Sequence, residues 1–266
     1  MNPTTLQAEA AISISGIDDH AHLAVGEGSV WVTVVLETPT QTDGVVRIDP
    51  TTNQVAANIN ISGYVKDIVV GGGTVWVTTS GEPSGTLVGI NPSTNRVIGA
   101  PLTLPGSGPG PIAYIDGVLW ITNLDSGGSL TRLDAATLTE LSTPSLPGVN
   151  GTASSLSNSV WVAKGENVVR LDPGSAVITA TIPINRAADV AVTAGAVWVL
   201  SVTGSTDPDL YDPDPLQPEF VSKIDPATNQ VTATANLGES PASLGIGEGA
   251  TWVADYDGGI VWKVVG

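Results

Sequence analysis

Several residue types are scarce in this 266-residue chain, and each scarcity excludes a class of function. There is no cysteine, which rules out disulfides and thiolate metal sites. Lysine and arginine number 9 against 26 acidic residues, so the formal net charge is 9 − 26 = −17. No Lys/Arg cluster offsets this acidity, and an acidic surface repels phosphates. Nucleic acid is therefore not expected as a partner.

Long apolar runs are also missing. No stretch approaches the roughly 20 apolar residues of a membrane-spanning helix, so no membrane span is expected. The first ten residues lack the basic start and apolar core of a signal peptide, which leaves a cytoplasmic protein or a mature form without its leader. The absence of cysteine leaves the compartment open. The Thr-, Ser-, Gly- and Val-rich, Lys-poor composition favours an extracellular or cell-surface protein.

What the chain does contain is a repeated phrase with a central tryptophan, first seen as Gly28–Thr33 (GSVWVT). Successive copies are 45, 44, 41, 37 and 54 residues apart, at Trp31, Trp76, Trp120, Trp161, Trp198 and Trp252. A strand-based period in the forties is typical of a β-propeller with four-stranded blades. The sequence thus predicts an all-β, six-bladed propeller of antiparallel blades, formed by residues 1–266 as one domain.

Each repeat is predicted to contain four strands. In the first repeat these are residues 23–25, 30–35, 45–48 and 55–61. Alternation puts Trp31 and Thr33 on one face of the second strand and Val30 and Val32 on the other. Nearly every residue of that strand is apolar, so both faces must be covered, as they are when blades stack. We therefore expect the tryptophans to lie between blades.

Two kinds of turn recur. Gly-rich turns such as Gly26–Gly28 suit tight hairpins that need positive φ. The turn between the third and fourth strands reads Asp-Pro-Thr-Thr-Asn at Asp49–Asn53, where Asp accepts backbone N–H bonds and Pro presets φ. The terminal Asn suits a left-handed exit. Further copies begin at Asn91, Asp172 and Asp225, with a degenerate one at Asp134.

A sixth copy of this turn stands near the start of the chain, as Asn2–Thr5 followed by Leu6–Ile14. The last repeat lacks an outer strand after Ile260–Val265. We predict that residues 2–15 supply it and close the ring beside the C-terminal strand, which removes a free sheet edge.

One insertion breaks the period, at residues 205–219 in the fifth repeat. Four prolines and five acidic residues predict a stiff, solvated loop. Its aspartates could gather calcium, although the alternating prolines and missing glycine fit a solvated lid better. With Tyr211, Tyr256 and the loops between second and third strands, it forms an acidic loop face. The other acidic residues of this face are Glu37, Glu82, Asp125, Glu166, Asp255 and Asp257.

The positions nine residues before each repeated tryptophan, which we call the minus-nine positions, mark the start of the innermost strand. They are His22, Asp67, Pro111, Thr152, Asp189 and Ser243. In a propeller they ring the mouth of the central channel, so we predict a polar axial pocket there. Solvation of a wet channel mouth is the alternative explanation of their polarity.

Both histidines of the chain fall in this region, because His20 precedes His22 by two residues on the same side of an extended segment. His20 and His22 are candidate catalytic bases. His22, Asp67 and Asp189 are candidate ligands of a divalent cation, which is the one cofactor considered. The ligand-binding set is completed by Thr152, Ser243, Tyr211 and Tyr256.

A serine-nucleophile site is not expected, because there is no Gly-x-Ser-x-Gly and no third histidine. Two acceptor sequences for N-glycosylation begin at Asn60 and Asn150.

The phrases Ala24–Thr33 (AVGEGSVWVT) and Val46–Val55 (VRIDPTTNQV) resemble repeats of streptogramin (virginiamycin B) lyase-like bacterial propeller proteins. The likeness covers essentially every blade and concerns the scaffold. Family members that act as lyases resemble seven-bladed rings that use histidines and a glutamate with magnesium, drawn from late blades. Here the count is six blades, and repeats two to six contain no histidine, so the catalytic residues have no counterparts and the activity is not carried over.

Three functions follow as hypotheses. The first is a non-catalytic binding or interaction module, with an acidic loop face and a polar axial pocket for a small molecule, protein or glycan. The second is a metal-assisted lyase or hydrolase at the axial His/Asp ring. The third is a structural subunit of an extracellular assembly that self-associates through blade flanks.

Overall fold

The computed structural model describes most of the chain. The described residues are 12–14, 22–36, 42–81, 83–106, 108–124, 128–149, 151, 153–155, 159–193, 195–202, 219–238, 241–247, 250–255 and 261–264. Every regular element among them is a β-strand. No described helix has the length and apolarity to cross a membrane. The chain forms two compact units, residues 1–126 with 131–143 and residues 127–130 with 144–266.

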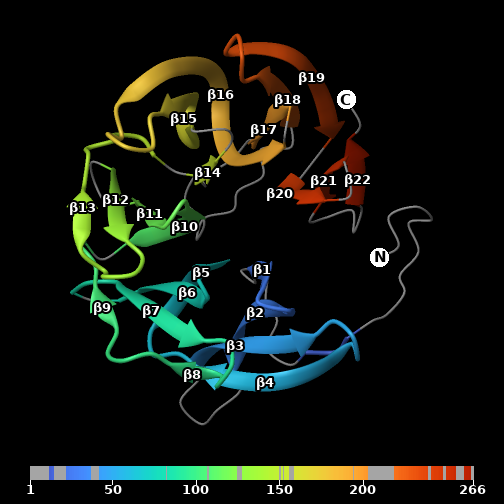
Figure 1. The fold of residues 1–266 in the computed structure, drawn as a ribbon. Helices are drawn as coiled ribbons and strands as arrows, with labels where there is room; N and C mark the ends of the chain where they lie inside the picture. The colour runs from blue at the N-terminus through green and yellow to red at the C-terminus, as the bar shows by residue number, and fades with distance from the viewer. Residues whose placement is uncertain are drawn as a thin grey trace. The chain divides into compact units, whose positions relative to one another are not determined.

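In the first unit, each predicted repeat becomes an antiparallel sheet whose strands follow chain order (Figure 1). The first sheet contains β1 (Leu23–Gly26), β2 (Ser29–Leu36), β3 (Thr42–Asp49) and β4 (Gln54–Asn60). The second contains β5 (Tyr64–Gly71), β6 (Thr74–Ser80), β7 (Thr86–Asn91), β8 (Arg96–Val97) and β9 (Leu102–Thr103). The third contains β10 (Pro109–Ile115), β11 (Val118–Asn123), β12 (Ser129–Asp134) and β13 (Glu140–Ser142). The predicted strands are therefore confirmed to within a few residues.

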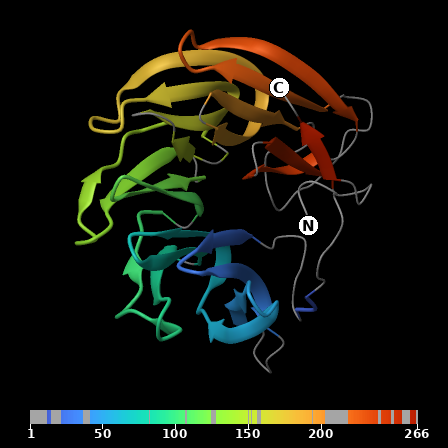
Figure 2. The same cartoon turned by 45° about the vertical axis from the view of Figure 1, so that its right-hand side comes forward.

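The second unit differs from the prediction, because repeats four and five share one six-stranded sheet. Its strands are β14 (Ala153–Ser155), β15 (Val160–Leu171), β16 (Ile178–Thr193), β17 (Ala196–Ser201), β18 (Glu219–Asp225) and β19 (Gln230–Gly238). A smaller sheet contains β20 (Pro241–Gly247), β21 (Ala250–Asp255) and β22 (Val261–Val264). Figure 2 shows the same strands from another side.

The merger has a local cause in β16. Its first half pairs with β15, as Val168 opposite Ile182, and its second half pairs with β17, as Val190 opposite Val199. Arg186 lies between them with φ of 56°, and the register shifts between Ala187 and Asp189. Such a bulge bends a strand without ending it. One strand therefore serves as the outer strand of repeat four and the inner strand of repeat five.

The five repeated tryptophans whose side chains the structure describes are buried, as predicted. Trp31, Trp120 and Trp161 are at most 1% exposed, and Trp76 and Trp198 are 6% exposed. The apolar clusters around them join neighbouring repeats: Trp31 packs with Val75 and Ile90 of the second repeat. In the second unit, Trp161 packs with Val197 and Ile224 of the fifth repeat. The tryptophan phrase is thus the core between adjacent repeats.

The turn predictions are also confirmed where the turns are described. Glu27 and Gly28 have φ of 51° and 68°, as a two-residue hairpin with two positive φ angles requires. Asn53, Asn95 and Asn229 all leave their turns with φ between 55° and 57°. In the first turn, the Thr51 amide and hydroxyl donate to Asp49 Oδ1 at 2.8 and 2.6 Å.

The aspartates of these turns make the free energy of unfolding depend on pH under acidic conditions. The hydroxyl and amide of Thr51 hold the pKa of Asp49 below its ordinary value of 3.8, as Thr137 does for Asp134. The pKa of Asp225 is lowered by the Ala227 amide and the Thr228 hydroxyl. A lowered pKa adds stability that is present in full above the ordinary pKa and is lost as the pH falls through the folded-state value.

We therefore expect Asp49→Asn/Asp134→Asn/Asp225→Asn to keep the fold at pH 7 and to flatten the fall of melting temperature between about pH 5 and pH 2. The chain supplies the precedent, since Asn91 in the second repeat accepts the Ser93 amide at 2.9 Å. Thermal melts across this range measure the effect, with Asp116→Asn, an exposed aspartate outside these turns, as control. Superimposable acid profiles for wild type and triple variant would contradict the assignment.

The predicted N-terminal strand is described only at residues 12–14. Ile12 and Ile14 pack against the apolar cluster of Val32, Val34 and Ile48 on the first sheet. Pairing of residues 2–15 with the C-terminal strand lies outside the described residues, and so do residues 205–218 of the insertion. The six-bladed ring and its closure stay predictions.

Candidate functional site

Backbone hydrogen bonds hold His22 in place at the start of the first sheet. It stands directly before β1, where its amide donates to Thr33 Oγ1 at 2.7 Å and its carbonyl accepts from the Thr33 amide at 2.9 Å. Thr33 is 3% exposed in β2 and two residues after Trp31, so the buried phrase fixes the His22 backbone. The imidazole is left at the surface.

The structure brings His22 together with Asp67, as the minus-nine spacing predicted. His22 Nδ1 lies 3.3 Å from Asp67 Oδ1. The histidine side chain is 44% exposed and the aspartate side chain only 14%. The contact joins the first repeat to the second, because Asp67 lies in β5.

The Asp67 carboxylate has a second role that the sequence did not reveal. Its Oδ1 accepts the amide of Ile68 at 2.8 Å, and its Oδ2 accepts the amide of Ile112 at 2.9 Å. Ile112 directly follows the minus-nine residue of the third repeat, Pro111. One carboxylate therefore fastens the second repeat to the third while it contacts the first.

Asp189 repeats this arrangement in the second unit. Its Oδ1 accepts the Val190 amide at 2.8 Å, and its Oδ2 accepts the Leu244 amide at 2.9 Å. Leu244 again directly follows a minus-nine residue, Ser243. Both minus-nine aspartates thus link consecutive repeats through backbone hydrogen bonds, and we call this the fastener role. The sequence shows an Asp followed by an aliphatic residue at both positions. Whether the carboxylate accepts an amide of the next repeat depends on how the next sheet packs, which the sequence does not show.

The other predicted site residues are not gathered by the described structure. Asp67 and Asp189 belong to different units, and the one contact observed within the proposed His22/Asp67/Asp189 metal set is that of His22 with Asp67. Ser243 is described by its backbone pairing with Ala254. His20, Thr152, Tyr211 and Tyr256 lie outside the described residues. Within the described part of the chain, no three potential ligands of the His, Cys, Asp and Glu types come together.

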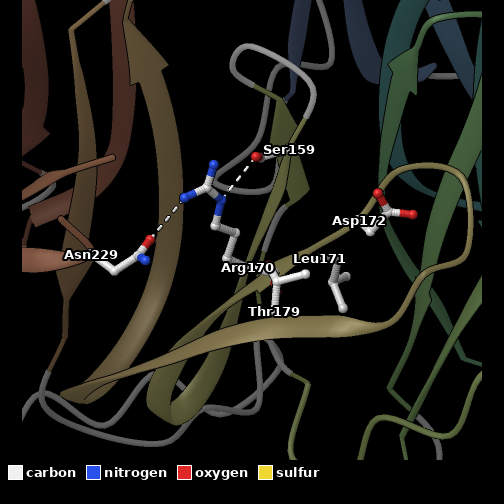
Figure 3. A pocket seen from close by; sticks show the side chains of 6 residues that line it. All are labelled: Ser159, Arg170, Leu171, Asp172, Thr179 and Asn229. Carbon is white, nitrogen blue, oxygen red and sulfur yellow. Dashed lines mark hydrogen bonds between the residues drawn. The ribbon is translucent and has the colours of Figure 1, made fainter. Parts of the chain in front are cut away.

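A further polar site, which sequence reasoning missed, surrounds Arg170 (Figure 3). Arg170 Nε donates to Ser159 Oγ at 2.8 Å, and Nη1 donates to Asn229 Oδ1 at 3.0 Å and to the Pro226 carbonyl at 2.9 Å. Its guanidinium carbon is 5.2 Å from the centroid of the Trp161 ring. A cavity of about 220 Å³ opens beside it, lined by Ser159, Arg170, Leu171, Asp172, Thr179 and Asn229.

The same contacts recur in the first unit. Arg47 stacks on Trp31 at 5.3 Å and donates to Ser29 Oγ at 2.8 Å. Its Nη1 donates to Asn95 Oδ1 at 3.0 Å and to the Pro92 carbonyl at 2.7 Å. In both units an arginine thus clasps the Asp/Asn-Pro turn of the next repeat. Because the set recurs as a unit, we interpret the Arg170 cavity as part of the scaffold.

The arginine could have been found from the sequence by its place opposite the tryptophan. Trp31 pairs with Arg47 across β2 and β3, and Trp198 pairs with Lys223 across β17 and β18. A cation over an indole adds about 0.5–2 kcal/mol, more when it is desolvated. The Asp-Pro-x-Thr-Asn turn therefore has two uses, to reverse the chain and to receive this arginine.

No family model and no curated protein matches the chain. Many solved structures resemble it, and three of them are described here. The computationally designed Ika8 protein has 15% identity and a TM-score of 0.65, and the match covers 91% of this chain and 70% of that one. Hydrazine synthase of Kuenenia stuttgartiensis has 11% identity and a TM-score of 0.68, with coverage of 88% and 73%. BamB of Moraxella catarrhalis has 15% identity and a TM-score of 0.58, with coverage of 90% and 82%.

Likenesses at this level of identity concern the fold alone. They support the predicted scaffold, and no sequence match ties the chain to the streptogramin lyase-like family. The chain thus has an all-β fold that resembles known β-propeller structures.

Proposed function

We propose that the chain is a non-catalytic binding or interaction module of the β-propeller type, and that its partner binds at the strand ends around His22. The observation that carries this proposal is the presentation of the imidazole. Asp67 is anchored by two backbone amides and contacts His22 Nδ1, while the histidine side chain is 44% exposed. A positioned, accessible polar group on a rigid scaffold is what a binding site requires.

The chemistry of the pair indicates what His22 would bind. A carboxylate beside Nδ1 favours the tautomer with its proton on Nδ1, which turns the Nε2 lone pair outward. That nitrogen accepts a hydrogen bond from a hydroxyl, an amide or an ammonium group. With a net charge of −17, neutral and cationic partners are favoured over anions. Small polar molecules, glycans and basic protein segments meet these conditions.

The role of the aspartates favours binding over catalysis. Asp67 and Asp189, the two carboxylates predicted to act in a site, each accept amides from two consecutive repeats. A carboxylate engaged in this way holds the scaffold together and positions His22. The Lys-poor, Thr/Ser-rich composition leads us to propose an extracellular or cell-surface setting.

A second candidate function, a metal-assisted lyase or hydrolase, draws on the same pair. A carboxylate behind a histidine is the usual support of a metal-ligating imidazole. His22 would ligate a divalent cation through Nε2 or act as a base, and His20, two residues earlier in the sequence, is the second candidate ligand.

The binding proposal is tested on protein labelled with ¹⁵N in its two histidines. Spermidine, decalysine and a panel of neutral oligosaccharides serve as probes, followed by NMR of the imidazoles and by calorimetry. We expect at least one probe to shift the His22 signals, with a Kd that rises at least tenfold in His22→Ala, or about 1.4 kcal/mol. Thr51→Ala, an exposed change in an Asp-Pro turn, should leave the Kd unchanged.

Two results would contradict the proposal: His22 signals that ignore every probe, or equal weakening by the two variants. Mn²⁺ separates the second candidate. Paramagnetic broadening of both histidines at micromolar Mn²⁺, abolished by Asp67→Asn, would favour the metal-dependent enzyme over the binding module.

A further inference from the structure

Lys66 departs from the pattern that the repeats share. It lies ten residues before the repeated tryptophan of the second repeat and directly before Asp67. The corresponding residue of every other repeat is alanine or glycine: Ala21, Gly110, Gly151, Ala188 and Ala242. In the third repeat packing demands this, because a Cβ added to Gly110 would lie 2.9 Å from Leu124 Cγ and 3.0 Å from Thr122 Oγ1. The scaffold therefore takes a small residue at this position, and the long Lys66 side chain needs another explanation.

A β-bulge places the Lys66 side chain. β5 pairs with β6 as Val65 opposite Thr79 and Asp67 opposite Thr78, which leaves Lys66 as the extra residue. Bulges are frequent next to functional sites, where they re-aim a side chain. The Val65 side chain is buried, whereas Lys66 is half-buried.

Tyr64 is the second departure, and Lys66 lies over its ring, with Nζ 5.0 Å from the centroid. The residues twelve positions before the other repeated tryptophans are not aromatic: Asp19, Gly108, Val149, Arg186 and Ser240. Tyr64 is 39% exposed. Among the described residues no carboxylate pairs with the Lys66 ammonium, whereas the stacked guanidinium of Arg47 donates to Asn95 Oδ1. The pair is thus no clasp between repeats, and it presents an aromatic ring and a cation at the surface.

This pair adjoins the site proposed around His22. Asp67, the next residue after Lys66, contacts His22 Nδ1 at 3.3 Å. One short stretch of β5 therefore supplies the ring of Tyr64, the ammonium of Lys66 and the carboxylate behind the imidazole. Ligand sites commonly combine an aromatic wall with a few polar groups that fix orientation.

We propose that Tyr64 and Lys66 make the site around His22 specific for neutral carbohydrate, an inference that rests on the proposed function and selects among its partner classes. The C–H face of a pyranose ring is apolar and packs on an aromatic ring such as Tyr64. Its hydroxyls can donate to His22 Nε2 and accept from Lys66 Nζ.

Charge excludes the other partner classes. The Lys66 ammonium repels basic protein segments and polyamines, and the net charge of −17 repels anions. At the site itself the charges of Lys66 and Asp67 are opposite, so a neutral ligand meets little net charge.

The test uses the full chain and measures the Kd by calorimetry and by NMR of the His22 imidazole. The probes are cellotriose, maltotriose and chitotriose, with spermidine, decalysine and trigalacturonate for comparison. We expect at least one neutral trimer to bind more tightly than the three charged probes. Its Kd should rise about tenfold in Tyr64→Ala and should stay within about twofold in Tyr64→Phe, which keeps the ring.

The lysine has a matched control. Lys66→Ala should weaken the trimer several-fold and strengthen spermidine, because it removes a donor to the sugar and a repelling charge. Lys223→Ala should change neither Kd, although Lys223 also stacks on an aromatic ring, with Nζ 5.5 Å from the centroid of Trp198 in the second unit. Equal effects of the two lysine variants overturn the assignment to Lys66.

Three further results overturn the inference and leave the binding proposal for His22 standing. The first is equal binding of a neutral trimer by wild type and Tyr64→Ala. The second is a His22 response to spermidine or decalysine and to no trimer. The third is tighter binding of trigalacturonate than of every neutral trimer. Silence of His22 towards all six probes removes the binding proposal as well.

Discussion

Trp161→Ala is expected to lower the free energy of unfolding by about 3–5 kcal/mol, the usual cost of removing a fully buried tryptophan. Trp161 is 0% exposed and packs in the cluster that joins repeats four and five. Its loss also leaves the Arg170 guanidinium without the ring beneath it. For a domain of this size, the melting temperature should fall by roughly 10 °C.

Thermal and urea unfolding measure this effect. Val177→Ala is the control, because Val177 is 59% exposed and such surface changes stay within about 0.5 kcal/mol. A Trp161→Ala protein as stable as Val177→Ala would show that the repeated phrase is not the core between repeats.

Asp67→Ala should have the second largest effect, about 2–4 kcal/mol. Hydrogen bonds to a charged group each contribute about 1.5–3 kcal/mol, and the substitution leaves the amides of Ile68 and Ile112 without their acceptor. Water can reach part of the site, because the Asp67 side chain is 14% exposed, and this keeps the cost below the sum.

Amide hydrogen exchange adds a readout specific to the fastener role. In Asp67→Ala the Ile112 amide should exchange faster than in the wild type, while amides of β17 keep their protection. Asp189→Ala should do the same at Leu244 in the second unit. Asp49→Asn is the control, since Asn91 occupies the equivalent position in the second repeat. Unchanged protection at Ile112 would contradict the fastener role.

Much of the fold could be predicted, because it depends on local pattern. The apolar phrase around Trp31 predicts a strand covered on both faces, and the strand is buried. The Asn at position 53 predicts a left-handed residue at the end of the turn, and its φ is positive. The merged sheet of repeats four and five could not be predicted. It depends on whether Arg186 and Ala187 break the ladder or only bend it, and the short spacing of 37 residues was the one hint.

The contact of one pair in the candidate site was predicted, and the hydrogen bonds that its aspartate accepts from neighbouring repeats were not. The minus-nine count placed His22 beside Asp67, and the pair is found in contact. That Asp67 would accept the Ile112 amide depends on the packing of the third sheet on the second, 45 residues away. The clasp of Arg47 on Asn95 was missed for the same reason, since its partner lies in the next repeat.

Asp67 and Asp189 hold consecutive repeats together, and we propose that His22 is the minus-nine residue that binds the partner. All nineteen replacements at each of the three positions, scored for resistance to proteolysis, test this division of roles most directly. Nearly every replacement at Asp67 and Asp189 should be destabilising. At His22 most should be neutral, since the imidazole is 44% exposed and a polar contact at the surface contributes about 0–1 kcal/mol. If His22 proved as intolerant as Asp67, the histidine would be a structural residue and the binding face would lose its centre.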